Sequence, residues 1–226
     1  MKLAALVSGG KDSLYSMFLA KREHEISVFV SIKSENPESY MFHVPGIDIV
    51  KLQAESMNIP IIFKETKGVK EEELNDLKDA LKEAKKKYEI EGVVSGAIYS
   101  KYQKDRIEKI CNELQLKSIT PIWGAKTGQL WKDMIDAGFD IIVIAVAASG
   151  LDKSWLGRKI DKKAVVELTN LHDTCYVCTG FEGGEAESLV LNCPMFSKKI
   201  KIIESEIKWD NKTQSGELII KKAELI

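Results

Sequence analysis

The 226-residue sequence has few cysteines, no strong excess of either charge and no long hydrophobic run. Four cysteines are too few for the disulfide scaffold of a secreted protein, and a cytosolic setting would keep them reduced. The 33 basic and 34 acidic side chains give a net charge of −1, which supplies no bulk attraction to nucleic acid. The sequence also lacks a membrane-spanning run and the features of a signal peptide at its start. We therefore expect a cytoplasmic protein with no membrane partner and no stable nucleic-acid partner.

What the sequence contains is an alternation of two kinds of segment. Short apolar segments rich in β-branched residues have the composition of strands, and segments of helical period separate them. The expected strands are residues 3–7, 27–32, 60–63, 92–95 and 141–146, and the expected helices are residues 11–21, 47–57, 70–88 and 101–116. Continuously apolar strands are usually buried on both faces of a sheet. The alternation therefore predicts an α/β fold with a doubly wound, Rossmann-like parallel sheet.

This rhythm changes in the second half of the chain. Beyond residue 149, glycines and short polar turns replace it, and residues 201–208 and 216–222 have the pattern of two strands around a polar turn. We therefore predict two domains. The parallel sheet is expected in residues 1–120, and a smaller α+β domain is expected in residues 121–226.

A glycine-rich loop stands between the first expected strand and the first expected helix. Its residues are Ser8, Gly9, Gly10, Lys11, Asp12 and Ser13. Adjacent glycines let backbone N–H groups approach phosphate oxygens, and the helix N-terminus, the lysine and the serine hydroxyls attract the same oxygens. Asp12 would repel bare phosphate, so its expected role is to hold Mg²⁺ directly or through water. The loop predicts a nucleotide site, and the alternative is a plain turn with a helix cap.

A second cluster of functional residue types lies in the C-terminal half. Glu182, Glu185 and Glu187 place three carboxylates within six residues, around the flexible pair Gly183 and Gly184. Clustered carboxylates suit a cation. The alternative is an acidic surface loop that leads into the following strand, because runs of charge are usually solvated.

Two more candidates follow the fourth expected strand. Gly96 ends that strand at the edge where ligands bind to parallel sheets, and it would allow a nucleotide or substrate to approach closely. A plain strand-to-helix turn is the alternative. Tyr102 and Arg106 open the next helix and could reach the same crevice. Arg106 could equally pair with Asp105 or Glu108 on the surface.

The remaining candidates are single residues or pairs. Arg158 is a candidate oxyanion contact, and its alternative is a surface ion pair. His43 and His172 are too isolated to form a metal site. Cys175 and Cys178 lack the second ligand cluster of a zinc site, so they are either structural or incidental cysteines or a redox pair.

The glycine-rich loop resembles the PP-loop of the N-type ATP pyrophosphatases, an adenine nucleotide alpha hydrolase-like (HUP-type) superfamily that splits ATP into AMP and pyrophosphate. It lacks the longer Gly-x-x-x-x-Gly-Lys-[Ser/Thr] span of kinases and GTPases. Further segments across nearly the whole chain resemble the diphthine–ammonia ligases, namely residues 95–98, 102–103, 106–108, 121–124, 156–158 and 182–188. Ala186 is smaller than the residue common in that family, and residues 179–181 form a longer lead-in.

The resemblance implies a reaction and a set of residues. Diphthine, on a modified histidine of translation elongation factor 2, would be adenylated by ATP and amidated by free ammonium, giving diphthamide, AMP and pyrophosphate. The implied catalytic residues are Lys11 and Asp12, the latter on Mg²⁺. The implied nucleotide contacts are Ser8, Gly9, Gly10, Lys11, Asp12, Ser13 and Gly96. The implied acceptor-substrate contacts are Tyr102, Arg106, Arg158, Glu182, Gly183, Gly184, Glu185, Glu187 and Ser188. A homodimer is one possible assembly of this chain.

Two other interpretations stay open. A tRNA-modifying ATP pyrophosphatase would share the loop, but it should show a basic RNA-binding face or paired catalytic cysteines, and the near-zero net charge argues against it. A non-catalytic nucleotide-sensing module could share the fold, although it has less need of Lys11 and Asp12.

Overall fold

The computed structural model describes residues 1–36, 46–69 and 71–226. His43 and Lys70, which entered the sequence-based expectations, lie outside the described residues. The chain forms two compact units. Unit 1 contains Met1–Ser8 and Asp12–Gly124, and unit 2 contains Gly9–Lys11 and Ala125–Ile226. The cut between residues 120 and 121 that the sequence suggested stays a prediction.

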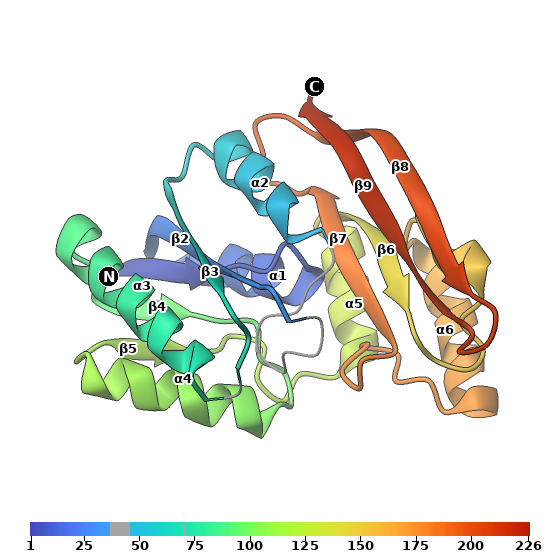
Figure 1. Ribbon diagram of the computed structural model, residues 1–226, viewed down its shortest axis with the longest axis horizontal. Helices are drawn as coiled ribbons and strands as arrows, with labels where there is room; N and C mark the ends of the chain where they lie inside the picture. Colours follow the sequence, from blue (N-terminus) through green and yellow to red (C-terminus); the bar gives the residue numbers. More distant parts are fainter. Residues whose placement is uncertain (37–45, 70) are drawn as a thin grey trace. The chain divides into compact units, whose positions relative to one another are not determined.

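Unit 1 is built on a five-stranded parallel sheet, which confirms the predicted α/β fold. Its strands are β1 (Lys2–Leu6), β2 (Glu25–Ser34), β3 (Ile61–Thr66), β4 (Gly92–Val94) and β5 (Lys117–Ile119), in the order β3-β2-β1-β4-β5 (Figure 1). Every neighbouring pair is parallel. The strand order reverses between β1 and β4, and the carboxyl ends of the strands at such a switch point are where open parallel sheets bind ligands.

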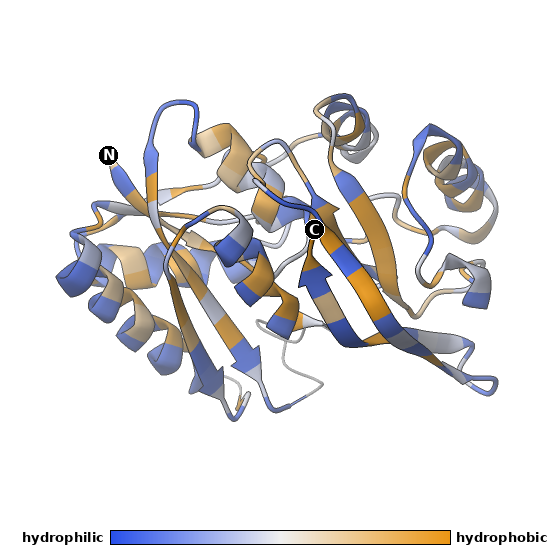
Figure 2. Ribbon diagram, turned by 90° about the horizontal axis from the view of Figure 1, so that it is seen from above, coloured by the Kyte–Doolittle hydropathy of each residue, from blue (hydrophilic) through white to orange (hydrophobic). Residues whose placement is uncertain are grey.

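Helices follow the strands of this sheet, and those that share its core cluster present an apolar stripe to it. They are α1 (Lys11–Ala20), α2 (Val50–Ser56), preceded by the 3-10 turn Ile47–Ile49, α3 (Glu73–Tyr88) and α4 (Lys101–Glu113). In α3, Leu77, Ala80, Leu81 and Ala84 recur at helical spacing and are buried in the core. Figure 2 shows that hydrophobic and hydrophilic residues alternate along the helices. Burying each leucine contributes about 1.5–3 kcal/mol. The third and fourth helices share one core cluster with the sheet.

Unit 2 contains a four-stranded antiparallel sheet with two helices, which confirms the predicted α+β character. Its strands are β6 (Asp140–Val146), β7 (Ala186–Asn192), β8 (Ile200–Asp210) and β9 (Ser215–Leu225), in the order β7-β6-β9-β8. The helices are α5 (Thr127–Asp136) and α6 (Lys162–Cys175), and the 3-10 turn Lys153–Trp155 lies between β6 and α6. The predicted hairpin at residues 201–208 and 216–222 is confirmed as β8 and β9.

Residues 141–146, an expected strand, belong to the antiparallel sheet of unit 2. They form β6, which pairs antiparallel with β7 and β9. Residues 141–144 are all buried, and a strand with both faces covered reads as a continuous apolar run in either kind of sheet. The sequence pattern therefore could not distinguish the two sheets. In the part of the chain that the structure describes, no helix combines the length and apolar character needed to cross a membrane.

Candidate functional site

The glycine-rich loop follows β1, the central strand of the parallel sheet. Ser8 and Ser13 close it, because the Ser8 N–H donates to Ser13 Oγ at 3.3 Å and the two hydroxyls lie 3.3 Å apart. Gly9 has φ of 88°, in the left-handed region that favours glycine. The turn therefore needs a glycine at its second position.

Gly96 packs directly against this loop. A Cβ atom at position 96 would lie 2.6 Å from the backbone nitrogen of Ser13 and 2.7 Å from the carbonyl carbon of Asp12. Those separations are too short for any side chain. The structure shows close approach of the loop backbone at Gly96. The close approach of a nucleotide that the sequence suggested there stays a prediction.

Lys11 is buried although it carries a charge, with 4% of its surface exposed. Its backbone N–H donates to Ser188 Oγ at 3.2 Å. Its ammonium lies 5.4 Å from the ring centroid of Trp131 and 5.8 Å from that of Phe181. All of these residues belong to unit 2. Neither aromatic residue was singled out from the sequence, because an aromatic residue in an apolar helix or beside a loop reads as ordinary core.

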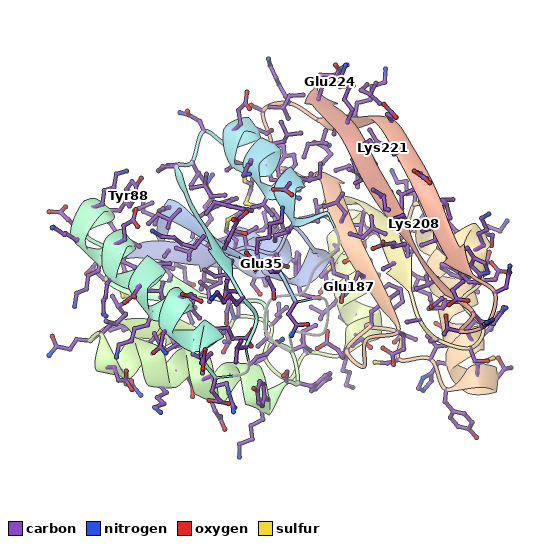
Figure 3. The ribbon with its side chains drawn as sticks, viewed as in Figure 1. Glu35, Tyr88, Glu187, Lys208, Lys221 and Glu224 are labelled. Atoms are coloured by element: carbon purple, nitrogen blue, oxygen red, sulfur yellow. The ribbon has the colours of Figure 1, made fainter. Side chains whose placement is uncertain are left out.

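The three carboxylates of the acidic segment lie in different surroundings. Both carboxylate oxygens of Glu185 accept backbone hydrogen bonds, from Gly183 N–H at 2.8 Å and from Cys178 N–H at 3.2 Å. Glu185 therefore closes its own loop. Glu182 is exposed, as the alternative of a solvated loop requires, and Glu187 lies half-buried on β7 (Figure 3).

The end of this segment is bonded to the glycine-rich loop. Ser188 accepts the hydrogen bond from Lys11 described above, and the Val190 N–H donates to the carbonyl of Gly9 at 3.0 Å. Ser188 is buried, with 5% of its surface exposed. The structure thus brings together two clusters that lie 177 residues apart in the sequence.

Tyr102 and Arg106 form a cluster with a residue that the sequence did not suggest. The Arg106 guanidinium lies 3.4 Å from the centroid of the Tyr102 ring, and its Nε donates to Glu71 Oε1 at 3.1 Å. A second guanidinium nitrogen also pairs with Glu71, which raises the pKa of Arg106 mainly through this hydrogen bond. Glu108, a predicted partner, pairs with Lys104 at 2.7 Å instead. Arg106 therefore has the ion pair that was the alternative to a substrate contact, but its acidic partner comes from the segment before α3 and not from α4.

Arg158 has the ion pair that was the alternative to a substrate contact. Its Nη1 lies 2.6 Å from Glu167 Oε2 on α6, and its guanidinium stacks 4.3 Å from the ring centroid of Trp155. This hydrogen bond lowers the pKa of Glu167. A substrate contact by Arg158 stays a prediction.

Cysteine and histidine provide no metal centre in the described part of the chain. Among the described residues, no group of three or more His, Cys, Asp or Glu side chains is arranged to hold a metal ion. His172 Nδ1 lies 3.0 Å from the carbonyl of Val177, at the end of α6. Burial raises the pKa of the Cys111 thiol to about 12, so this cysteine stays protonated and unreactive.

A shallow hollow of about 400 Å³ lies at the amino ends of the parallel strands, opposite the end where the glycine-rich loop begins. Its lining includes Lys2, Ile26 and Pro60, which stand at the amino ends of β1, β2 and β3. The glycine-rich loop follows the carboxyl end of β1. The hollow is therefore not part of the candidate site.

Comparison with known proteins gives matches along nearly the whole chain. The family described as the diphthamide synthase N-terminal domain matches residues 1–118, and the diphthamide synthase C-terminal domain matches residues 126–226. A diphthine–ammonia ligase of Bos taurus is 34% identical over 229 residues, which cover 92% of this chain and 85% of the relative. That of Rattus norvegicus is 36% identical over 228 residues, which cover 91% and 84%.

Other similarities are more partial. A diphthine–ammonia ligase of Schizosaccharomyces pombe is 32% identical over 225 residues, which cover 92% of this chain but 37% of that longer relative. A crystal structure of a predicted subunit of tRNA methyltransferase from Methanocaldococcus jannaschii aligns with a TM-score of 0.42 and 13% identity, over 86% of this chain and 98% of that one. A likeness this low carries no argument about function. The two domain matches and the near-full-length relatives show that this chain belongs to the diphthine–ammonia ligase family.

Proposed function

We propose that this protein uses ATP to amidate diphthine on translation elongation factor 2 with ammonium, giving diphthamide, AMP and pyrophosphate. The observation that carries the proposal is the direct bonding of the two sequence clusters. Lys11 N–H donates to Ser188 Oγ at 3.2 Å, and Val190 N–H donates to the Gly9 carbonyl at 3.0 Å. An enzyme that adenylates a carboxylate must hold that carboxylate beside the α-phosphorus of ATP. The bonds join the proposed nucleotide loop to the proposed acceptor segment.

The first step is attack of the diphthine carboxylate on the α-phosphorus of ATP. The bond to pyrophosphate breaks, and an acyl-adenylate forms. Catalysis of phosphoryl and nucleotidyl transfer consists mostly of positioning and stabilisation of developing charge. In the proposed roles the Lys11 ammonium stabilises charge on the phosphates, and Ser8, Gly9, Gly10 and Ser13 hold their oxygens.

Asp12 is the proposed protein ligand of Mg²⁺. It stands half-buried in the first turn of α1, next to Lys11. When bound, Mg²⁺ supplies positive charge to the phosphate oxygens. The described residues offer no cluster of three ligands, which fits a metal whose remaining ligands are phosphate oxygens and water.

In the second step ammonia attacks the acyl carbon and AMP leaves. Glu182 and Glu187 are the proposed carboxylates for the cationic groups, namely ammonium and the trimethylammonium of diphthine. Glu185 shapes the acceptor loop through its bonds to Gly183 and Cys178. Gly184, with φ of 81°, lets that loop turn.

The other acceptor contacts that we propose are Tyr102, Arg106 and Arg158. Each arginine is held by a carboxylate, Glu71 or Glu167 respectively. Elongation factor 2 is the proposed protein substrate, the cytoplasm the proposed location, and a homodimer a proposed assembly that light scattering on the purified protein would test.

The test is an incubation of the purified protein with ATP, Mg²⁺, ammonium and elongation factor 2 that carries diphthine. AMP release and the mass change from carboxylate to amide are followed together. We expect Lys11→Ala to reduce AMP formation by roughly a hundredfold or more, because it removes the positive charge that we propose stabilises the phosphates.

Lys51→Ala is the matched control, since Lys51 lies over the ring of Phe63 at 4.2 Å and outside the loop. It should retain full activity. Near-normal turnover by the Lys11 variant would refute the assignment. AMP release that depends on tRNA instead of elongation factor 2 would keep the loop assignment and refute the acceptor, and binding of ATP without cleavage would indicate a nucleotide sensor.

A further inference from the structure

The Lys11 side chain lies against two aromatic rings. Its ammonium is 5.4 Å from the centroid of Trp131 and 5.8 Å from that of Phe181. The two rings meet edge to face, with centroids 5.7 Å apart and planes at 73°. Both distances to the ammonium fall within the range of cation–π attraction. Lys11 and both rings lie inside unit 2.

Hydrogen bonds fix the indole of Trp131. The residue lies on α5 with 1% of its surface exposed, and its Nε1–H donates to the carbonyl of Thr179 at 2.6 Å. The Thr179 hydroxyl is in turn 2.9 Å from the hydroxyl of Thr127, at the start of the same helix. The ring therefore cannot turn away from Lys11 without breaking a buried hydrogen bond.

Phe181 reaches the lysine through an unusual backbone conformation. Its φ is 63°, which a residue with a large side chain rarely adopts, and its N–H donates to the Cys178 carbonyl at 2.9 Å. Only 7% of the residue's surface is exposed. Such a conformation persists only where the surroundings determine it.

We propose that Trp131 and Phe181 are positioning residues for Lys11, and that together they form an aromatic seat for its ammonium. Neutral rings attract a cation through their quadrupoles, so the two rings restrict where the ammonium can lie. The seat thus holds Lys11 beside the loop that we propose binds a nucleoside triphosphate. This inference rests on the proposed function in one respect, that the loop binds ATP.

The seat also restricts water near the ammonium. Lys11, Trp131 and Phe181 are all buried, and attraction between a charge and a phosphate grows as water is excluded. Replacing either ring by leucine would keep the site apolar and remove the attraction. We expect Trp131→Leu and Phe181→Leu each to weaken binding of Mg²⁺–ATP about fivefold to tenfold.

The test is a double-mutant cycle on the full chain, with the dissociation constant for Mg²⁺–ATP measured by calorimetry. In the Lys11→Met background, Trp131→Leu should change the constant by less than roughly twofold, because the partner is gone. Trp131→Phe and Phe181→Tyr should restore affinity. The control is Phe63→Leu, which removes a ring beneath Lys51 away from the loop and should leave affinity unchanged.

A second measurement reads the seat without nucleotide. Ring currents should shift the ε-methylene proton resonances of Lys11 upfield, and Trp131→Leu or Phe181→Leu should move them back. Normal shifts in the unmodified protein would overturn the proposal. So would a Trp131→Leu effect on ATP affinity that is equally large with and without Lys11→Met, or failure of the aromatic variants to restore affinity at an unchanged Tm.

The outcomes separate this inference from the proposed function. ATP binding with the expected coupling but no amidation would refute the proposed reaction and leave the seat intact. ATP binding that the leucine variants do not affect would refute the seat alone. Absence of ATP binding by the unmodified protein would refute both.

Discussion

Gly96 is constrained by the glycine-rich loop, which follows a different strand of the sheet. Its missing side chain lets the end of β4 touch the backbone of Asp12 and Ser13, on the loop that follows β1. The contact joins the segments that follow two neighbouring strands, β1 and β4, at the point where the strand order reverses. Position 96 therefore sets how far the loop can lie from the sheet edge.

Gly96→Ala should push the loop away and weaken binding of ATP by roughly tenfold, because its Cβ would meet the Ser13 nitrogen at 2.6 Å. Calorimetric titration with Mg²⁺–ATP measures the effect. The control is Gly128→Ala on α5, where a Cβ would have no neighbour within 4 Å. That variant should gain up to about 1 kcal/mol of stability and bind ATP as before. Unchanged affinity in Gly96→Ala would contradict the assigned geometry.

At the scale of an element, the side chain of Asp161 caps the start of α6. Asp161 is extended, with ψ of −177°, and its carboxylate accepts the N–H of Ala164 at 2.8 Å. This backbone hydrogen bond is the main reason that the pKa of Asp161 falls below its ordinary value of 3.8. The ionised carboxylate is therefore the form that stabilises the helix, since it satisfies a free N–H at the helix start.

Asp161→Ala should lower Tm by about 2–4 °C at neutral pH, through loss of the cap. A lowered folded-state pKa means that the stabilisation is present above the unfolded pKa and disappears as pH falls through the folded value. The Tm difference between Asp161→Ala and the unmodified protein should therefore shrink in acid. Asp161→Asn should keep most of the cap without that pH dependence. A Tm difference that stays constant down to roughly pH 2 would count against this account.

Several elements could be predicted from the sequence because their signals are local. The run of residues 3–7, the loop and α1 are contiguous, so strand, turn and helix appear in order. β5 was missed because Lys117–Ile119 is a three-residue strand without a continuous apolar run. β6 was expected as a strand, but its partners could not be predicted, because burial on both faces erases the alternation that distinguishes sheets.

The candidate site was predictable in part for the same reason. The residue types of the loop and of the acidic segment are visible in the sequence, but which of them touch is not. The bond from Lys11 to Ser188 spans 177 residues, and no local pattern reports it. The pairing of Glu71 with Arg106 depends likewise on how α3 and α4 pack, and Glu185 could be recognised as a loop-closing residue only from its two backbone bonds.

At the scale of the whole molecule, the two units are not two consecutive pieces of chain. Gly9–Lys11 belong to unit 2, whereas the residues on either side of them belong to unit 1. Within unit 2 the Gly9 carbonyl accepts the Val190 N–H of β7, which is an edge strand of the antiparallel sheet. Exposed edges are templates for pairing with other chains. The loop therefore covers part of an edge.

A fragment of residues 125–226 should consequently self-associate at concentrations where the full chain stays dispersed. It lacks Gly9, whose carbonyl accepts the Val190 N–H in the full chain, so this part of the β7 edge loses its cover. Multi-angle light scattering of fragment and full chain at equal concentration measures this. A fragment that remains a single species, with the antiparallel sheet intact by amide hydrogen exchange, would show that the loop is not needed to protect the edge.

The bond between Lys11 and Ser188 also sets an order of events during synthesis. The residue at position 11 leaves the ribosome 177 residues before its partner. At bacterial and eukaryotic elongation rates this interval is roughly ten to thirty-five seconds. For much of that time the nascent loop lacks Ser188 and the rings of Trp131 and Phe181. A nucleotide that needs the seated lysine would bind only after residue 188 has been made, so ATP binding would report synthesis of the chain through β7.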